Sequence, residues 1–109
     1  MKLIVNRSRI SDFKADHFLR QAGFAYIFDN KSGHSSYVRR LSRDFYPRLH
    51  LYVMEEKDKA GRDLIVLELH LDQKKASYQG VRMHSAEYDG DVVESEIGRL
   101  KGLLKNYVL

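Results

Sequence analysis

The chain has 109 residues, with 19 Lys and Arg against 15 Asp and Glu, a net charge of +4 and no cysteine. This length suits one domain with its own hydrophobic core, so residues 1–109 are expected to form a single domain. The absence of cysteine excludes a disulfide framework and a thiolate metal site. No apolar run approaches the roughly 18 residues that a membrane span needs, and the apolar start is too short for a signal peptide. A cytoplasmic protein without a membrane partner is therefore expected.

The first part of the chain predicts a strand, a helix and a pair of strands. Ser11 is expected to cap a helix over residues 12–22, and Gly23 is a natural end for it. The segment 29–33 has the composition of a turn. The strands are expected at residues 2–5, 24–28 and 36–41.

Residues 48–54 and 64–72 alternate apolar and polar side chains, which is typical of strands with one buried face. The polar segment between them contains Gly61, so the two strands are expected to form a hairpin. Slipping the register by one residue would send the leucines into water, and this favours Leu51 beside Leu69. On the other face the same register pairs Arg48 with Asp72, His50 with His70, and Tyr52 with Glu68.

The rest of the chain predicts a long connection and a final helix. Residues 73–90 show no clear periodicity, and structureless connections longer than roughly 12–15 residues are often functional. Asp91 is expected to cap a helix over residues 92–108, with close packing at Gly98 and Gly102. The order β-α-β-β-β-β-α predicts an α+β fold, an antiparallel sheet of four to five strands with both helices packed on one face. The other face is expected to be open to solvent or a ligand.

The open face is the first candidate site, with six side chains expected there: Arg48, His50, Tyr52, Glu68, His70 and Asp72. Two imidazoles and a carboxylate from neighbouring strands suit a metal site, and they equally suit a general acid–base pair. The favoured interpretation is simpler, namely cross-strand pairing on a solvated face. No cofactor is therefore expected, and metal binding by His50, His70 and Asp72 is kept as an alternative.

Positive charge gathers in the first half of the chain. Residues 1–54 contain ten Lys and Arg against four Asp and Glu, whereas residues 55–109 contain nine against eleven. Cations beside aromatic rings are typical of phosphate and base contacts, although a solvated basic surface gives the same pattern. The candidate nucleic-acid contacts are Arg39, Arg40, Arg43, Arg48, Tyr52, Lys74, Lys75, Tyr78 and Arg82.

A third cluster precedes the final helix and consists of His84, Glu87, Asp89 and Asp91. Acidic residues at this place are expected to cap the helix and to interact with its dipole. If the connection folds over the open face, His84 would join His50 and His70.

Three functions follow from these patterns. The leading hypothesis is a small non-catalytic module that binds nucleic acid or another polyanion through its Arg and Lys clusters. The alternative is a phosphate-ester hydrolase or nuclease, with or without a metal ion, whose catalytic residues would be His50, His70, Glu68 and Asp72. Two carboxylates on one face favour this alternative, because they repel a nucleic-acid backbone unless a cation neutralises them. The third is a protein–protein interaction module, including self-association through an edge strand or the open face.

Overall fold

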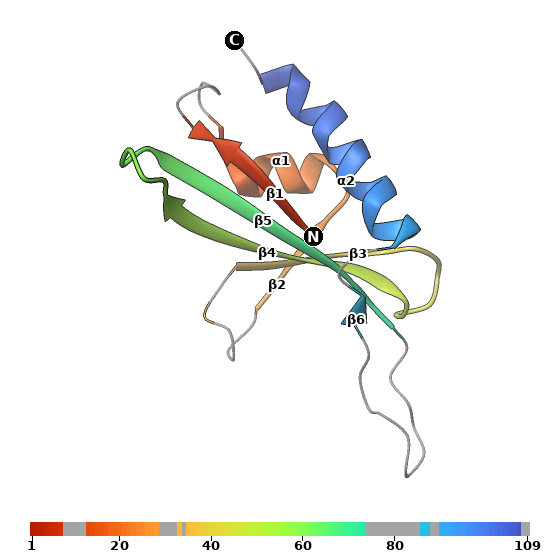
Figure 1. The fold of residues 1–109 in the computed structure, drawn as a ribbon. Coiled ribbons are helices and arrows are strands. Elements are labelled where there is room, and N and C mark those ends of the chain that lie inside the picture. Colours follow the sequence, from red (N-terminus) through yellow and green to blue (C-terminus); the bar gives the residue numbers. More distant parts are fainter. Residues whose placement is uncertain (8–12, 29–32, 34, 74–85, 88–89, 108–109) are drawn as a thin grey trace.

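The computed structural model describes residues 1–7, 13–28, 33, 35–73, 86–87 and 90–107. Its elements are β1 (Lys2–Asn6), α1 (Ala15–Gln21), β2 (Ala25–Ile27), β3 (Ser35–Arg40), β4 (Arg48–Lys57), β5 (Asp63–Asp72), β6 (Ala86–Glu87), α2 (Asp91–Leu104) and the 3-10 helix η2 (Lys105–Tyr107). The predicted α+β class and its element order are confirmed (Figure 1). The short strand β6 is an addition, because two residues are too few to give a visible period.

The strands form one antiparallel sheet in the order β1-β5-β4-β3-β2, and β6 pairs with the end of β5. The long hairpin of β4 and β5 is its centre (Figure 1). The predicted register of this hairpin is confirmed: Arg48 lies opposite Asp72, His50 opposite His70, and Tyr52 opposite Glu68. The hairpin therefore sets which side chains share each face.

The turn of this hairpin is shorter than predicted, because β4 continues to Lys57 and β5 begins at Asp63. The Asp58 carboxylate accepts hydrogen bonds of 2.9 Å from the backbone N–H groups of Ala60 and Arg62. Gly61 has a φ of 81°, the left-handed conformation that glycine adopts without strain. The turn satisfies its own backbone groups, so both strands can pair along their full length.

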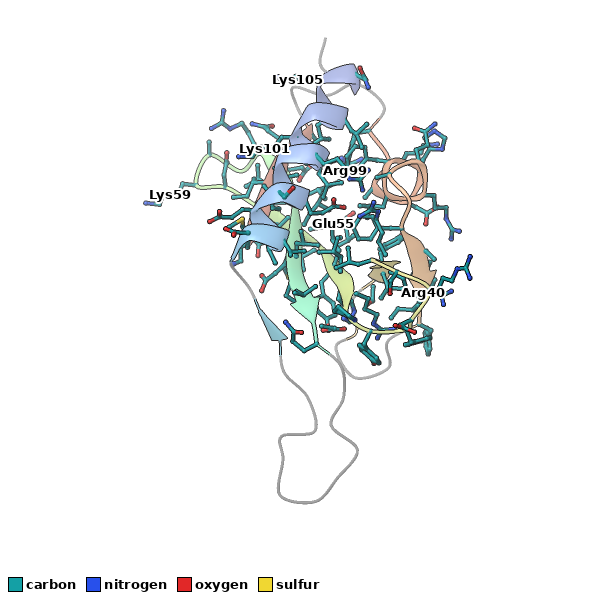
Figure 2. The ribbon with its side chains drawn as sticks, turned by 90° about the vertical axis from the view of Figure 1, so that its right-hand side faces the viewer. Arg40, Glu55, Lys59, Arg99, Lys101 and Lys105 are labelled. Carbon is teal, nitrogen blue, oxygen red and sulfur yellow. The ribbon has the colours of Figure 1, made fainter. Side chains whose placement is uncertain are left out.

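The core lies between the sheet and both helices. Leu51, Leu67 and Leu69 are fully buried on the face that packs against Phe18 of α1 and Leu100 of α2. Side chains of α1 and α2 thus enter the same apolar cluster, and Figure 2 shows both helices on one side of the strands. None of the described helices is long and apolar enough to cross a membrane.

The first helix differs from its prediction at its start. It begins at Ala15, and the side chain of the N-cap residue Lys14 makes no capping hydrogen bond. The predicted cap, Ser11, lies outside the described residues. Phe13 precedes the helix, is 4% exposed and packs against Phe18 with ring centroids 5.5 Å apart. Gly23 follows the helix with a φ of 98°, as expected for a helix end.

The second helix also differs from its prediction. Gly90, with a φ of 104°, is the N-cap, and Asp91 is the first helical residue. Asp91 in the first turn still interacts favourably with the helix dipole. The α-helix ends at Leu104 and continues as η2, four residues short of the predicted end. The prediction of close packing at Gly98 and Gly102 is wrong, because a Cβ atom at either position would meet nothing within 4 Å.

Tyr37 connects β3 to α1 from the core side of the sheet. Its hydroxyl donates a hydrogen bond of 2.7 Å to Asp16 Oδ1, and its ring meets the edge of Tyr26. Burial and this hydrogen bond raise the pKa of Tyr37 to about 12 from an ordinary 10.0. The same hydrogen bond, together with Arg20, holds the pKa of Asp16 below its usual value.

This contact predicts a loss of stability in alkali. Because the folded pKa of Tyr37 exceeds the unfolded one, its contribution is complete below about pH 10 and is lost as the pH rises towards 12. We expect the difference in melting temperature between wild type and Tyr37→Phe to shrink over this range. Absorbance titration should show one tyrosine ionising near pH 12 that Tyr37→Phe lacks. A difference in melting temperature that stays constant with pH would contradict this account.

Candidate functional site

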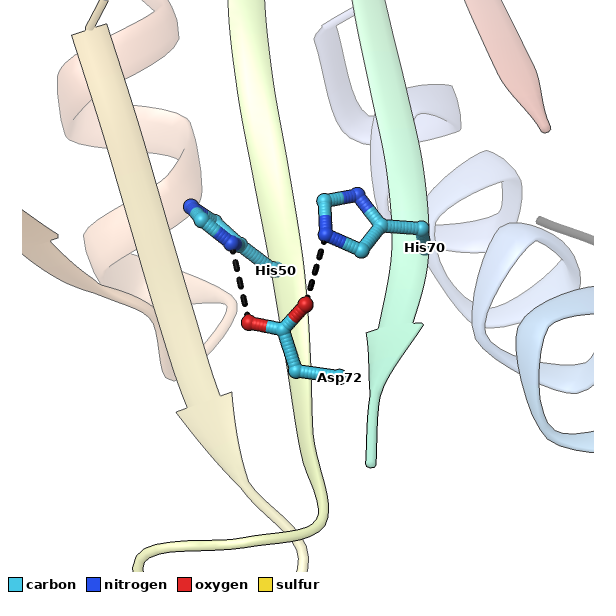
Figure 3. Close-up of side chains that lie close together, drawn as sticks. All are labelled: His50, His70 and Asp72. Atoms are coloured by element: carbon cyan, nitrogen blue, oxygen red, sulfur yellow. Dashed lines mark hydrogen bonds and ion pairs between the residues drawn. The ribbon is translucent and has the colours of Figure 1, made fainter. Parts of the chain in front are cut away.

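The candidate site lies at one end of the β4–β5 hairpin, on the face opposite the helices, where Arg48 and His50 lie beside Asp72 and His70. His50 comes from β4, whereas His70 and Asp72 come from β5, and strand pairing brings the three together (Figure 3). All three are buried, with exposed fractions of 8%, 3% and 2%. The expectation that these residues lie on a solvated face is therefore wrong.

The Asp72 carboxylate joins the two imidazoles. Its Oδ2 lies 3.0 Å from His50 Nδ1, and its Oδ1 lies 2.7 Å from His70 Nε2. Arg48 Nε donates to the same Oδ2 at 3.3 Å. Because an ionised carboxylate only accepts, His50 Nδ1 and His70 Nε2 each carry the hydrogen in this arrangement. Asp72 is thus the common acceptor for three neighbouring side chains.

Ser36 extends this network on the far side of His50. Its Oγ forms a hydrogen bond with His50 Nε2, and Ser36 is fully buried. With the hydrogen on Nδ1, a neutral His50 accepts at Nε2, so the Ser36 hydroxyl is the donor. Ser36 lies on β3 opposite Tyr52, the residue two positions after His50. Ser36 is a site residue that the alternation in the hairpin does not reveal, and the pairing of residues 36–41 with 48–54 is the signal that would place it there.

Asp72 is ionised over the whole physiological range. Burial alone would raise the pKa of Asp72, but hydrogen bonds and charge interactions from His50 and His70 outweigh it and hold this pKa far below its usual value. Arg48 adds a third contact from a side chain that is 12% exposed. The site therefore keeps a fixed negative charge between nitrogen donors.

Tyr52 packs beside both histidines. Its ring centroid lies 4.6 Å from that of His50 and 5.6 Å from that of His70, the second pair being stacked. These contacts place Tyr52 against the site as a half-buried neighbour. Glu68 does not join the cluster, because its nearest ion pair is with Lys2 of β1 at 3.8 Å. Of the four predicted catalytic residues, three converge and Glu68 stands apart.

Two kinds of chemistry suit the converging groups. Ser36, His50 and Asp72 have the connectivity of a nucleophile, base and carboxylate triad, but a fully buried Ser36 Oγ offers no approach to a substrate. By contrast, His50, His70 and Asp72 each offer one ligand atom within 4.8 Å of the others. Imidazole nitrogens and a carboxylate are common ligands of transition metals.

The predicted arginine cluster is divided by the sheet. Arg39 and Arg40 are consecutive on β3, so they point to opposite faces. On the helix side, Arg39 Nη1 lies 3.7 Å from Glu96 Oε1 of α2. On the other side, the Arg40 guanidinium lies 5.8 Å from the centre of the Phe45 ring. Arg43 is exposed in the segment between β3 and β4.

A cavity of about 380 Å³ lies beside the site, and we call it the arginine pocket. Three of its lining residues are the arginines Arg39, Arg40 and Arg48. The other lining residues are small, apolar or aromatic: Gly23, Ala25, Ile27, Val38 and Phe45. Arg48 belongs to both places, because it lines the pocket and also contacts Asp72.

Several predicted contacts fall in parts of the chain that the structure leaves undescribed. Lys74, Lys75, Tyr78 and Arg82 lie outside the described residues, as do His84 and Asp89. Glu87 lies in β6, where its backbone pairs with Leu71. The fold-back of His84 towards the histidines therefore stays a prediction.

The chemistry of the site has to be argued from its own residues. Comparison with protein-family models, with curated proteins and with solved structures gives no match for this chain.

Proposed function

We propose that the protein is a small module that binds nucleic acid or another polyanion at the arginine pocket. The observation that supports this proposal is the lining of that pocket, a cavity of about 380 Å³ to which Arg40 and Arg48 contribute from one face of the sheet and Arg39 from the other. A cavity of this size falls in the usual range for small-ligand sites, roughly 300–1,000 Å³. It suits one phosphate with part of its nucleotide.

The three arginines differ in how free they are to bind a phosphate. Arg48 contacts Asp72, and Arg39 lies near Glu96, so their charges are partly neutralised. Arg40 is exposed and forms no ion pair with a described residue. Its planar guanidinium can donate two parallel hydrogen bonds to a phosphate. Arg40 is therefore the main anion contact in this proposal.

Phe45 supplies an apolar surface next to these charges. Its side chain is 59% exposed, and the Arg48 guanidinium lies over its ring at 4.8 Å from the centroid. An exposed ring beside guanidinium groups suits a stacked base with its phosphate alongside. Unpaired bases can stack in this way, so single-stranded nucleic acid is the polyanion to test first.

The test measures binding of a fluorescein-labelled single-stranded oligonucleotide by fluorescence anisotropy. We expect binding that weakens steeply as the salt concentration rises. Phe45→Ala should lower the affinity about tenfold, since stacking contributes about 1–3 kcal/mol per base. Arg40→Ala should lower the affinity by a similar factor, because it removes the main anion contact. Lys59→Ala and Lys101→Ala are matched controls, because both remove one exposed charge far from Arg40 (Figure 2).

Two outcomes would count against the proposal. Absence of binding at low salt would reject a polyanion function. An equal loss of affinity in Lys59→Ala and Arg40→Ala would show that net charge, and not the arginine pocket, governs binding.

A phosphate-ester hydrolase is the second candidate function, and one observation favours it. Arg48 connects the pocket to the buried histidines, so a phosphate held there would lie near His50 and Asp72. Two observations weigh against it, namely the burial of the histidines and the separate position of Glu68. Binding without catalysis therefore accounts better for the geometry.

A further inference from the structure

The two histidines and Asp72 suggest a function beyond polyanion binding. Side chains at positions 50, 70 and 72 come from two adjacent central strands, and each of the three is at least nine-tenths buried. We propose that His50, His70 and Asp72 bind one divalent transition-metal ion through His50 Nδ1, His70 Nε2 and a carboxylate oxygen. Zn²⁺ is the first ion to test.

The ligand atoms of the three side chains already lie close together, within 4.8 Å of one another. They are now joined by hydrogen bonds of 3.0 Å from His50 Nδ1 and 2.7 Å from His70 Nε2 to the Asp72 carboxylate. Zinc bonds of about 2.0–2.2 Å in tetrahedral geometry place ligand atoms roughly 3.3 Å apart. The side chains would have to move so that one carboxylate oxygen and both imidazole nitrogens face a common point, and the paired strands would hold the ligands in position.

At His50 the proton positions are compatible with metal binding. A metal at His50 Nδ1 requires the ring hydrogen to move to Nε2, which would then donate to Ser36 Oγ. A hydroxyl can donate or accept, so Ser36 supports His50 in either tautomer. Metal-bound imidazoles commonly donate their second ring N–H to such a partner. Ser36 would therefore orient His50 and would not touch the metal.

Arg48 carries the positive charge that opposes a cation here, and its contacts allow it to move. Its hydrogen bond to Asp72 is long, at 3.3 Å. Its guanidinium also lies 4.8 Å from the ring centroids of both Phe45 and Tyr46. Arg48 can therefore move away from the carboxylate and keep its aromatic contacts.

The donor set selects among metals. Two imidazole nitrogens and one carboxylate suit Zn²⁺, Co²⁺, Ni²⁺ or Fe²⁺, whereas Mg²⁺ and Ca²⁺ prefer oxygen ligands. Three protein ligands would also leave a fourth coordination position of the metal for water.

The experiment titrates chelator-treated wild-type protein with Zn²⁺ by calorimetry, and with Co²⁺ by visible absorption. We expect one ion per chain, a raised melting temperature, and the strong visible bands of tetrahedral Co²⁺ with nitrogen ligands. His70→Ala and Asp72→Asn should each lower the affinity at least 100-fold. His17→Ala is the matched control. His17 is exposed on α1, so the His17→Ala variant should bind the metal with the affinity of wild type.

A further variant distinguishes a metal site from a purely structural network. Ser36→Ala keeps all three ligands and should lower metal affinity about 10–100-fold, the usual effect of losing such a supporting contact. If His70→Ala fails to fold, the Co²⁺ spectrum of wild type still tests the ligands. The proposal would be overturned if wild type showed no saturable metal binding. It would also be overturned if His17→Ala lost metal binding while Asp72→Asn kept it. Oligonucleotide binding in chelator tests the arginine pocket separately.

Discussion

Asp72→Ala, measured in the presence of a chelator, is expected to lower the free energy of unfolding by about 3–5 kcal/mol. Asp72 is 2% exposed and accepts hydrogen bonds from His50, His70 and Arg48. Removing its carboxylate leaves two buried imidazole N–H groups without their acceptor and a guanidinium without its counter-charge. Each such loss is costly in a buried site.

Asp63→Ala is the matched control for this experiment. Asp63 lies on the same strand, and its carboxylate also forms an ion pair, at 2.7 Å with Lys57. Both of these side chains are more than half exposed, so water replaces the lost contact and little change is expected. Urea unfolding of the two variants gives the comparison. Equal losses in both would show that Asp72 is no more than an ordinary surface charge.

Leu69→Ala is expected to lower the free energy of unfolding by about 2–5 kcal/mol. Leu69 is fully buried, lies opposite Leu51 and belongs to the cluster that both helices enter. The loss combines the transfer free energy of the removed methyl groups with the cavity that remains. Leu41→Ala makes the same chemical change at a side chain that is 41% exposed, so roughly 0.5 kcal/mol or less is expected.

Urea unfolding of these two leucine variants also tests the register. Were Leu69 on the opposite face of the sheet, its variant would behave like Leu41→Ala. A small effect at Leu69 with a large effect at Leu41 is therefore the result that contradicts the structure.

The hairpin could be predicted from the sequence because all of its leucines except Leu64 lie on one face. Any register that keeps Leu51 and Leu69 on one face also puts His50 and His70 together on the other face. The short turn then selects the register in which His50 lies opposite His70, and His50, His70 and Asp72 converge. Alternation, however, says which face a side chain occupies and not whether that face is covered.

Other features depend on contacts that a local pattern does not contain. Ser36 joins the site through the register of β3 against β4, which the irregular segment between those strands does not determine. Arg39 and Arg40 were grouped by charge, although consecutive strand positions face opposite ways. Gly90 caps α2 through its backbone conformation, which is not visible as a side-chain preference at Asp91.

The pairing of β1 with β5 has a consequence for the order in which the chain can fold. Residues near the N-terminus must find partners that follow them by more than half the chain, whereas β4 and β5 meet through a short turn. Closing a short loop has a lower entropic cost, so local pairing forms more readily than distant pairing. The three proposed ligands all belong to the β4–β5 hairpin. They can therefore meet as soon as the most local contacts of the sheet exist, before β1 completes its edge.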